Sequence, residues 1–187
     1  MNGQMGYYLL GVGIFLALLA LVAGYGYYHR RSHRTSKTTW DDLLARLVAV
    51  NHENIEQIAF DVIDESGQPR TDDGAKELRP EEIWRLVGGL KGLEVLEQNS
   101  LVLIDIAFYV QQWYPEAVIA AEELRQKARE IEWHVGRLRA AHANELEGGF
   151  ANDAQNTAAA YYLMTRRLLS LYQTGRLPML ADVHRAL

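Results

Sequence analysis

Metal chemistry on a helical scaffold would need histidines paired with acids, and the chain has six histidines. In a four-helix bundle, a di-metal centre uses Glu-x-x-His pairs that point inward. No histidine here has a glutamate three residues before it. His52-Glu53 begins like the zinc signature His-Glu-x-x-His, but Glu56 stands where the second histidine must be. Glu130 and His134 lie one turn apart, which we interpret as a surface salt bridge. With no cysteine in the chain, we predict no metal site.

One acid, Asp105, interrupts the apolar run 101–110 and is the candidate buried acid. An ionised carboxylate in an apolar core is costly unless it is paired. Asp105 could therefore handle protons or grip a ligand. Alternatively, it lies on the rim of its helix or pairs with an Arg or His of a neighbour, which is the interpretation we favour.

Other catalytic and cofactor motifs are missing from the sequence. It has no P-loop, no Gly-x-Gly-x-x-Gly after a strand, no Gly-x-Ser-x-Gly and no supported Ser/His/Asp order. Three tryptophans, Trp84, Trp113 and Trp133, and the ten tyrosines supply aromatic surface, some of which must be exposed and would favour a partner interface. We therefore predict a non-enzymatic protein with no cofactor.

The sequence is organised around an uncharged stretch, residues 7–28, which follows a short tail, 1–6. As a helix it would be about 33 Å long, enough to cross a bilayer core. Tyrosines flank both of its ends, as expected at membrane–water interfaces. A cleaved signal peptide would carry its positive charges before a shorter core. We predict an uncleaved single-pass anchor.

A basic juxtamembrane linker, 29–38, follows the stretch and predicts its orientation in the membrane. Positive flanks stay cytoplasmic, so the N-terminus is expected outside and the C-terminal domain in the cytoplasm of a bacterial inner membrane. The linker could also attract anionic lipid. Its basic residues are Arg30, Arg31, Arg34 and Lys37.

Small residues recur on one face of the predicted anchor. Such a face lets another membrane helix approach closely, either from a different protein or from a second copy in a homodimer. The residues of this face are Gly13, Ala17, Ala20 and Gly24.

The remainder, 39–187, is acidic and long enough for one domain with a core. The four basic residues of the linker leave 15 Lys and Arg against all 24 Asp and Glu. This balance argues against a nucleic-acid partner.

Apolar residues in this domain recur at helical spacing throughout, which predicts an all-α, antiparallel four-helix-bundle-like fold. We expect one helix over about 40–65, in which Asn51 could fix register through a buried hydrogen bond. A loop over 66–79 precedes a helix that starts at Pro80 and that Gly88, Gly89 and Gly92 could bend. Further helices are expected from 116 to the Gly148-Gly149 pair and over about 151–174, followed by a short helical tail.

A heptad seam typical of a coiled coil runs along the helix that follows residue 116. Its alanines imply close contact between helices. The seam residues are Ala117, Ala121, Leu124, Ala128, Ile131, Val135 and Leu138.

Together these features predict a single-pass, membrane-anchored helical interaction or scaffold protein, an accessory subunit of a larger membrane complex. Its expected partners are the lipid bilayer and other membrane-protein helices or a homodimer partner. The alternative is a membrane-tethered sensor or small-ligand-binding bundle, with a pocket near Asp105, Tyr109 and Trp113.

Overall fold

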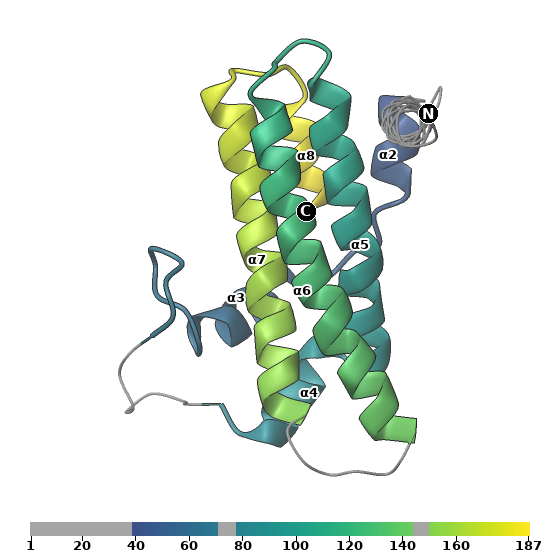
Figure 1. The fold of residues 1–187 in the computed structure, drawn as a ribbon, viewed down its shortest axis with the longest axis vertical. Coiled ribbons are helices and arrows are strands. Elements are labelled where there is room, and N and C mark those ends of the chain that lie inside the picture. Colours follow the sequence, from purple (N-terminus) through teal and green to yellow (C-terminus); the bar gives the residue numbers. More distant parts are fainter. Residues whose placement is uncertain (1–38, 71–77, 144–149) are drawn as a thin grey trace, which may run out of the picture. The chain divides into compact units, whose positions relative to one another are not determined.

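Three long helices lie side by side in antiparallel order in the computed structural model, which describes residues 39–70, 78–143 and 150–187 (Figure 1). They are α5 (Gly89–Val110), α6 (Ala117–Ala143) and α7 (Phe150–Thr174). The four shorter helices of the described residues are α2 (Trp40–Ala45), α3 (His52–Phe60), α4 (Pro80–Val87) and α8 (Leu180–Ala186). The described fold is therefore all-α, as predicted, and its only β feature is one antiparallel bridge between Ile63 and Pro69.

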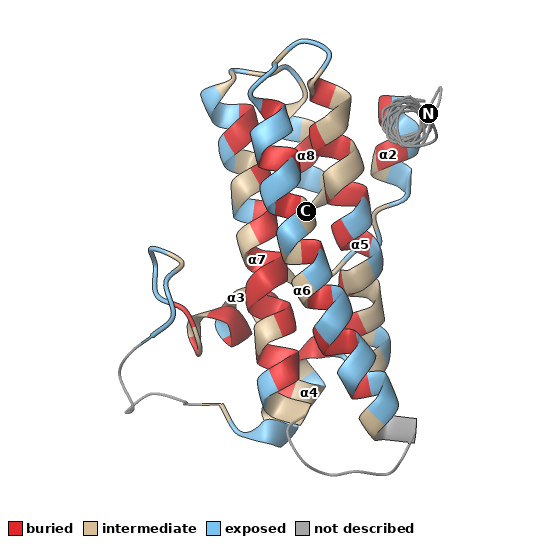
Figure 2. Ribbon diagram, in the orientation of Figure 1, coloured by how far each residue is buried: buried red, intermediate tan, exposed pale blue. Residues whose placement is uncertain are grey.

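Helix α7 forms the centre of the fold and is buried along most of its length (Figure 2). It packs against α5 and α6, and the shorter α3, α4 and α8 also lie against it. Its alanines keep the neighbouring helices close, while Tyr161 and Tyr172 fill the space between layers. Residues 40–187 form one compact unit around this core.

The predicted long helix over 40–65 is wrong, because the chain leaves the helix after Ala45. The buried Asn99 side chain of α5 takes over the backbone groups of Val48: Oδ1 accepts from Val48 N at 2.9 Å, and Nδ2 donates to Val48 O at 2.7 Å. The Asn99 amide thus supplies the two hydrogen bonds that a continued helix would otherwise give to the backbone of Val48. Asn51 is exposed rather than buried, and its Oδ1 caps α3 by accepting from Asn54 N at 3.0 Å.

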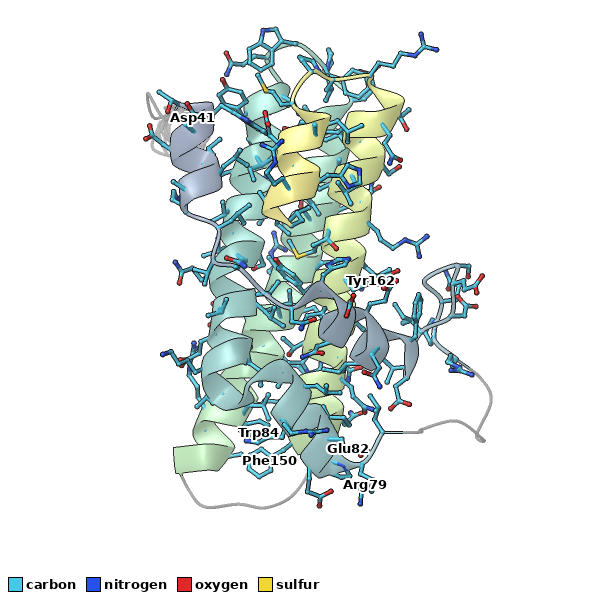
Figure 3. All side chains as sticks on the ribbon, turned by 180° about the vertical axis from the view of Figure 1, so that it is seen from behind. Asp41, Arg79, Glu82, Trp84, Phe150 and Tyr162 are labelled. Carbon is cyan, nitrogen blue, oxygen red and sulfur yellow. The ribbon has the colours of Figure 1, made fainter. Side chains whose placement is uncertain are left out.

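The helix predicted to start at Pro80 does so, but it is two helices separated at Gly88. Gly88 has φ 83°, a left-handed conformation that glycine adopts at little cost. Gly92 lies against the end of α4, where an added Cβ would be 1.7 Å from the Val87 carbonyl oxygen. Trp84 of α4 then packs against Phe150 at the start of α7, with ring centroids 6.0 Å apart (Figure 3).

Candidate interaction site

Asp105 is not the buried acid that the sequence allowed. Its side chain is 47% exposed, and its Oδ2 lies 2.8 Å from Arg46 Nη1. The favoured alternative, a rim carboxylate paired with an arginine, describes it correctly. A pair this exposed contributes at most about 1 kcal/mol to stability.

All seven residues of the predicted heptad seam are buried. They belong to α6, which packs against α5 and α7 within the same chain. The seam therefore builds the core of the bundle and is not an outward face for docking. The other two predicted sites, the small-residue face (Gly13, Ala17, Ala20, Gly24) and the basic linker, lie outside the described residues.

A buried polar pair joins α6 to the first turn of α7. His134 Nδ1 lies 2.8 Å from Asp153 Oδ1, and both residues are under 10% exposed. The predicted surface salt bridge of His134 with Glu130 is wrong, because Glu130 instead pairs with Lys127 at 2.7 Å. The positive end of the α7 dipole and Arg137, whose Nε is 3.4 Å from Asp153 Oδ2, also stabilise the carboxylate.

This pair supports an exposed tryptophan on the outer face of α6. Trp133 is 56% exposed. The Arg137 guanidinium lies 4.7 Å from the centre of its ring, and the His134 ring meets it edge-on at 4.7 Å. Asp153 contacts both Arg137 and His134, so the two side chains that touch the indole share one carboxylate.

Gly136 lies one turn after Trp133 and has no structural need to be glycine. It is exposed in the interior of α6, and an added Cβ would meet no atom within 4 Å. Glycine costs about 1 kcal/mol relative to alanine at such a position. We call Trp133, Gly136 and Arg137 the α6 platform.

The sequence contained a signal for part of this platform. With the seam at Ile131 and Val135, position 133 falls on the opposite, solvent-facing side of the helix. An aromatic residue there is unusual for a solvated face. The partner of His134, by contrast, could not be identified, because Asp153 is 19 residues away.

Comparison of the chain with known protein families, with curated proteins and with solved structures gives no significant match. The α6 platform must therefore be interpreted from its own geometry.

The histidine that resembles the start of a zinc signature is part of a tyrosine contact. His52 and Tyr162 have ring centroids 6.1 Å apart, and the Tyr162 hydroxyl donates to Glu56 Oε1 at 3.1 Å (Figure 3). Within the described ranges, no cluster of three or more His, Asp and Glu side chains is arranged to hold a metal ion. No helix of the described part is both long and apolar enough to cross a membrane, and the predicted span 7–28 lies outside that part.

A second aromatic cluster lies where α2 begins. Trp40 contacts Tyr109 (5.5 Å between centroids) and Tyr172 (6.0 Å), and Tyr109 contacts Trp113 (5.2 Å). Among the described residues, the buried Trp40 Nε1 and Tyr172 hydroxyl have no hydrogen-bond partner. Burial, and secondarily the neighbouring Tyr109, raises the pKa of Tyr172 above its ordinary value near 10.

Alkaline pH is expected to destabilise the fold through Tyr172. The folded protein holds the Tyr172 hydroxyl proton more tightly than the unfolded chain does. This group therefore leaves the free energy of unfolding unchanged below about pH 10 and lowers it as the pH rises further, by up to about 1.4 kcal/mol per pH unit. Tyr172→Phe should flatten this fall and, by removing an unpaired buried hydroxyl, add about 1 kcal/mol at pH 7. Urea unfolding from pH 7 to 11 measures both effects. A lower stability of Tyr172→Phe at pH 7 would show that the hydroxyl has a partner.

Proposed function

We propose that this chain is a single-pass, membrane-anchored helical protein that docks a partner helix and performs no catalysis itself, as an accessory subunit of a membrane complex. The uncharged stretch 7–28 and the basic residues after it support anchoring, with residues 39–187 in the cytoplasm of a bacterial cell. Partner docking is the role that the α6 platform supports best.

The observation that carries the proposal is an exposed tryptophan that contacts Arg137 and His134 and lies one turn from a glycine. Tryptophan and arginine dominate the energetics of protein interfaces. Trp133 lies between Arg137 and His134, so binding would cost little side-chain entropy. Gly136 leaves room on the same face for a second helix to approach the α6 backbone. The expected partner is therefore an apolar helix face.

Site-directed photocrosslinking in intact membranes tests the proposal. A photoreactive residue at the exposed Glu132, next to Trp133, should give one discrete adduct with another protein. The same residue at Leu101 of α5, which is also exposed (57%), is the matched control and should give none. Absence of an adduct from position 132, or its persistence after Trp133→Ala, would contradict docking at the α6 platform.

Gly136→Gln is expected to separate stability from docking. Glutamine is a good helix former, and the open space around residue 136 accepts it, so the fold should gain about 0.5–1 kcal/mol. The same side chain would occupy the space that a partner helix needs, so the crosslinked adduct should disappear. Denaturant unfolding and adduct yield measure the two effects. If the Gly136→Gln variant is more stable and still crosslinks fully, Gly136 is not part of the interface.

The alternative, a sensor or small-ligand bundle, has one observation in its favour. Trp40 Nε1 and the Tyr172 hydroxyl are buried and have no hydrogen-bond partner in the described part of the chain, and Trp40 contacts Tyr109, one of the residues expected near a pocket. A small hydrogen-bonding ligand could satisfy both atoms. A ligand screen by thermal shift, with Tyr172→Phe as the control that must lose the response, tests this alternative.

A further inference from the structure

We infer that one end of the helical bundle rests in the lipid–water interface through the exposed side chains of Trp113, Val118 and Ile119, here called the apolar cap. The inference rests on the proposed membrane anchor. It adds a second contact with the membrane, made by the folded domain.

The apolar cap lies at the turn between α5 and α6. Its three side chains are exposed by 59% (Trp113), 45% (Val118) and 62% (Ile119). Together they are half of the six large apolar side chains that are exposed in the described part of the chain. The exposed large apolar side chains of the described part are therefore concentrated within seven residues of sequence, 113–119.

The chain enters the bundle at this same end. Trp40, the first residue of α2, contacts Tyr109, and Tyr109 contacts Trp113 of the cap. Figure 3 shows Asp41 of α2 at the opposite end of the bundle from Trp84 and Phe150, and Figure 1 shows the α5–α6 turn at the same end as α2. In the sequence, Trp40 directly follows the predicted anchor and its basic linker, so this is the end of the bundle to which the predicted tether is joined.

The size of the cap favours lipid over protein as its occupant. A stable protein interface buries about 800 Å² on each partner, whereas a large aromatic side chain buries about 150–250 Å². The three apolar side chains of the cap cover less than such an interface needs, and residues 111–119 contain no arginine or glycine like those that accompany Trp133 at the α6 platform. The three side chains suffice for a domain that its tether already keeps at a high effective concentration near the bilayer.

The chemistry of the cap also suits the interface region. Tryptophan prefers the headgroup level of a bilayer because its ring is apolar and its N–H is polar. Within residues 111–119, which contain the cap, Glu116 is the one charged residue, and Asp41 and Asp42 of α2 are exposed at the same end of the bundle. The contact is therefore apolar, and it should form on zwitterionic lipid and persist at high salt.

Because the chain contains no cysteine, a single engineered thiol can report the depth of each position. Full-length Ile119→Cys is labelled with the environment-sensitive fluorophore NBD and reconstituted into phosphatidylcholine nanodiscs, with or without nitroxide-labelled lipid. Glu132→Cys is the matched control. It is exposed on the same helix, about 20 Å farther along α6.

The emission maximum of the label at position 119 should shift to the blue. Nitroxide-labelled lipid should quench most of its fluorescence and aqueous iodide should quench little, at low and at high salt. The label at position 132 should show the opposite response. If position 119 responds like position 132, or is shielded from both quenchers as a protein-covered site would be, the inference is overturned. Carbonate extraction of the same full-length chain from membranes tests the anchor separately. An extractable chain would refute the anchor, whereas a retained chain with a water-exposed position 119 would refute only the apolar cap.

Discussion

Replacing Gly92 with alanine is expected to cost about 3 kcal/mol or more of folding free energy, a large part of the stability of a domain this size. The added Cβ would lie 1.7 Å from the carbonyl oxygen of Val87 and 2.8 Å from its carbon. Both atoms are backbone, so no side-chain rotation relieves the clash. The α4–α5 junction must open, which pulls Ile83 and Val87 out of the core. Urea unfolding followed by circular dichroism measures the loss.

Gly88→Ala is the matched control at the same junction. The alanine would have to adopt a left-handed conformation (φ 83°), but its Cβ would lie no closer than 3.7 Å to any neighbouring atom. We therefore expect a cost of about 1–2 kcal/mol. Equal losses for the two variants would show that chain conformation, and not the contact with Val87, makes glycine necessary at residue 92.

Local pattern predicted most of the described helices because their signals lie within a few residues. Pro80 begins α4, the heptad seam follows α6 along its length, and Gly175 follows the end of α7. The predicted single helix over 40–65 was wrong because the signal that breaks it lies elsewhere. Val48 gives its backbone hydrogen bonds to Asn99, 51 residues away. A periodic apolar pattern cannot reveal a competing partner so distant in sequence.

The same limit applies to the candidate interaction site. The solvent-facing position of Trp133 follows from the seam register, and exposure of some of the tryptophans was expected. The fixation of Trp133 was not predictable, since it depends on Asp153 meeting His134 and Arg137 across two helices. For Asp105, the favoured interpretation of a rim carboxylate paired with an arginine agrees with the structure, but the sequence could not name Arg46, which lies 59 residues away on another segment.

The two ends of α6 thus offer different surfaces. The apolar cap at its start is small and lies near the point where the chain enters the bundle. The α6 platform, near its other end, has the residue types of a protein interface and a glycine that the fold does not require. If the cap faces the bilayer, the platform lies farther along α6 from that contact, where a protein partner could reach it.

His134→Leu is expected to cost about 3 kcal/mol and to abolish docking at the α6 platform. The substitution leaves the Asp153 carboxylate, 5% exposed, with Arg137 as its remaining charged contact at 3.4 Å. Removing the hydrogen-bond partner of a buried polar group costs about 1–3 kcal/mol, and the upper end of that range applies to a charged group. Arg137 would move toward the carboxylate and away from the Trp133 ring, so the tryptophan would lose both of its supports. Urea unfolding measures the stability, and adduct yield from position 132 measures docking.

The double variant His134→Leu, Asp153→Leu separates the two effects. Replacing both members of a buried pair with apolar residues is often nearly neutral, so most of the stability should return. Docking should not return, because Arg137 has lost Asp153 and Trp133 has lost the histidine ring. A coupling free energy of about 1–3 kcal/mol from the double-mutant cycle would establish the pair. A single-variant cost below about 1 kcal/mol, or adduct formation by the double variant at the level of the unaltered chain, would show that the pair does not position Trp133.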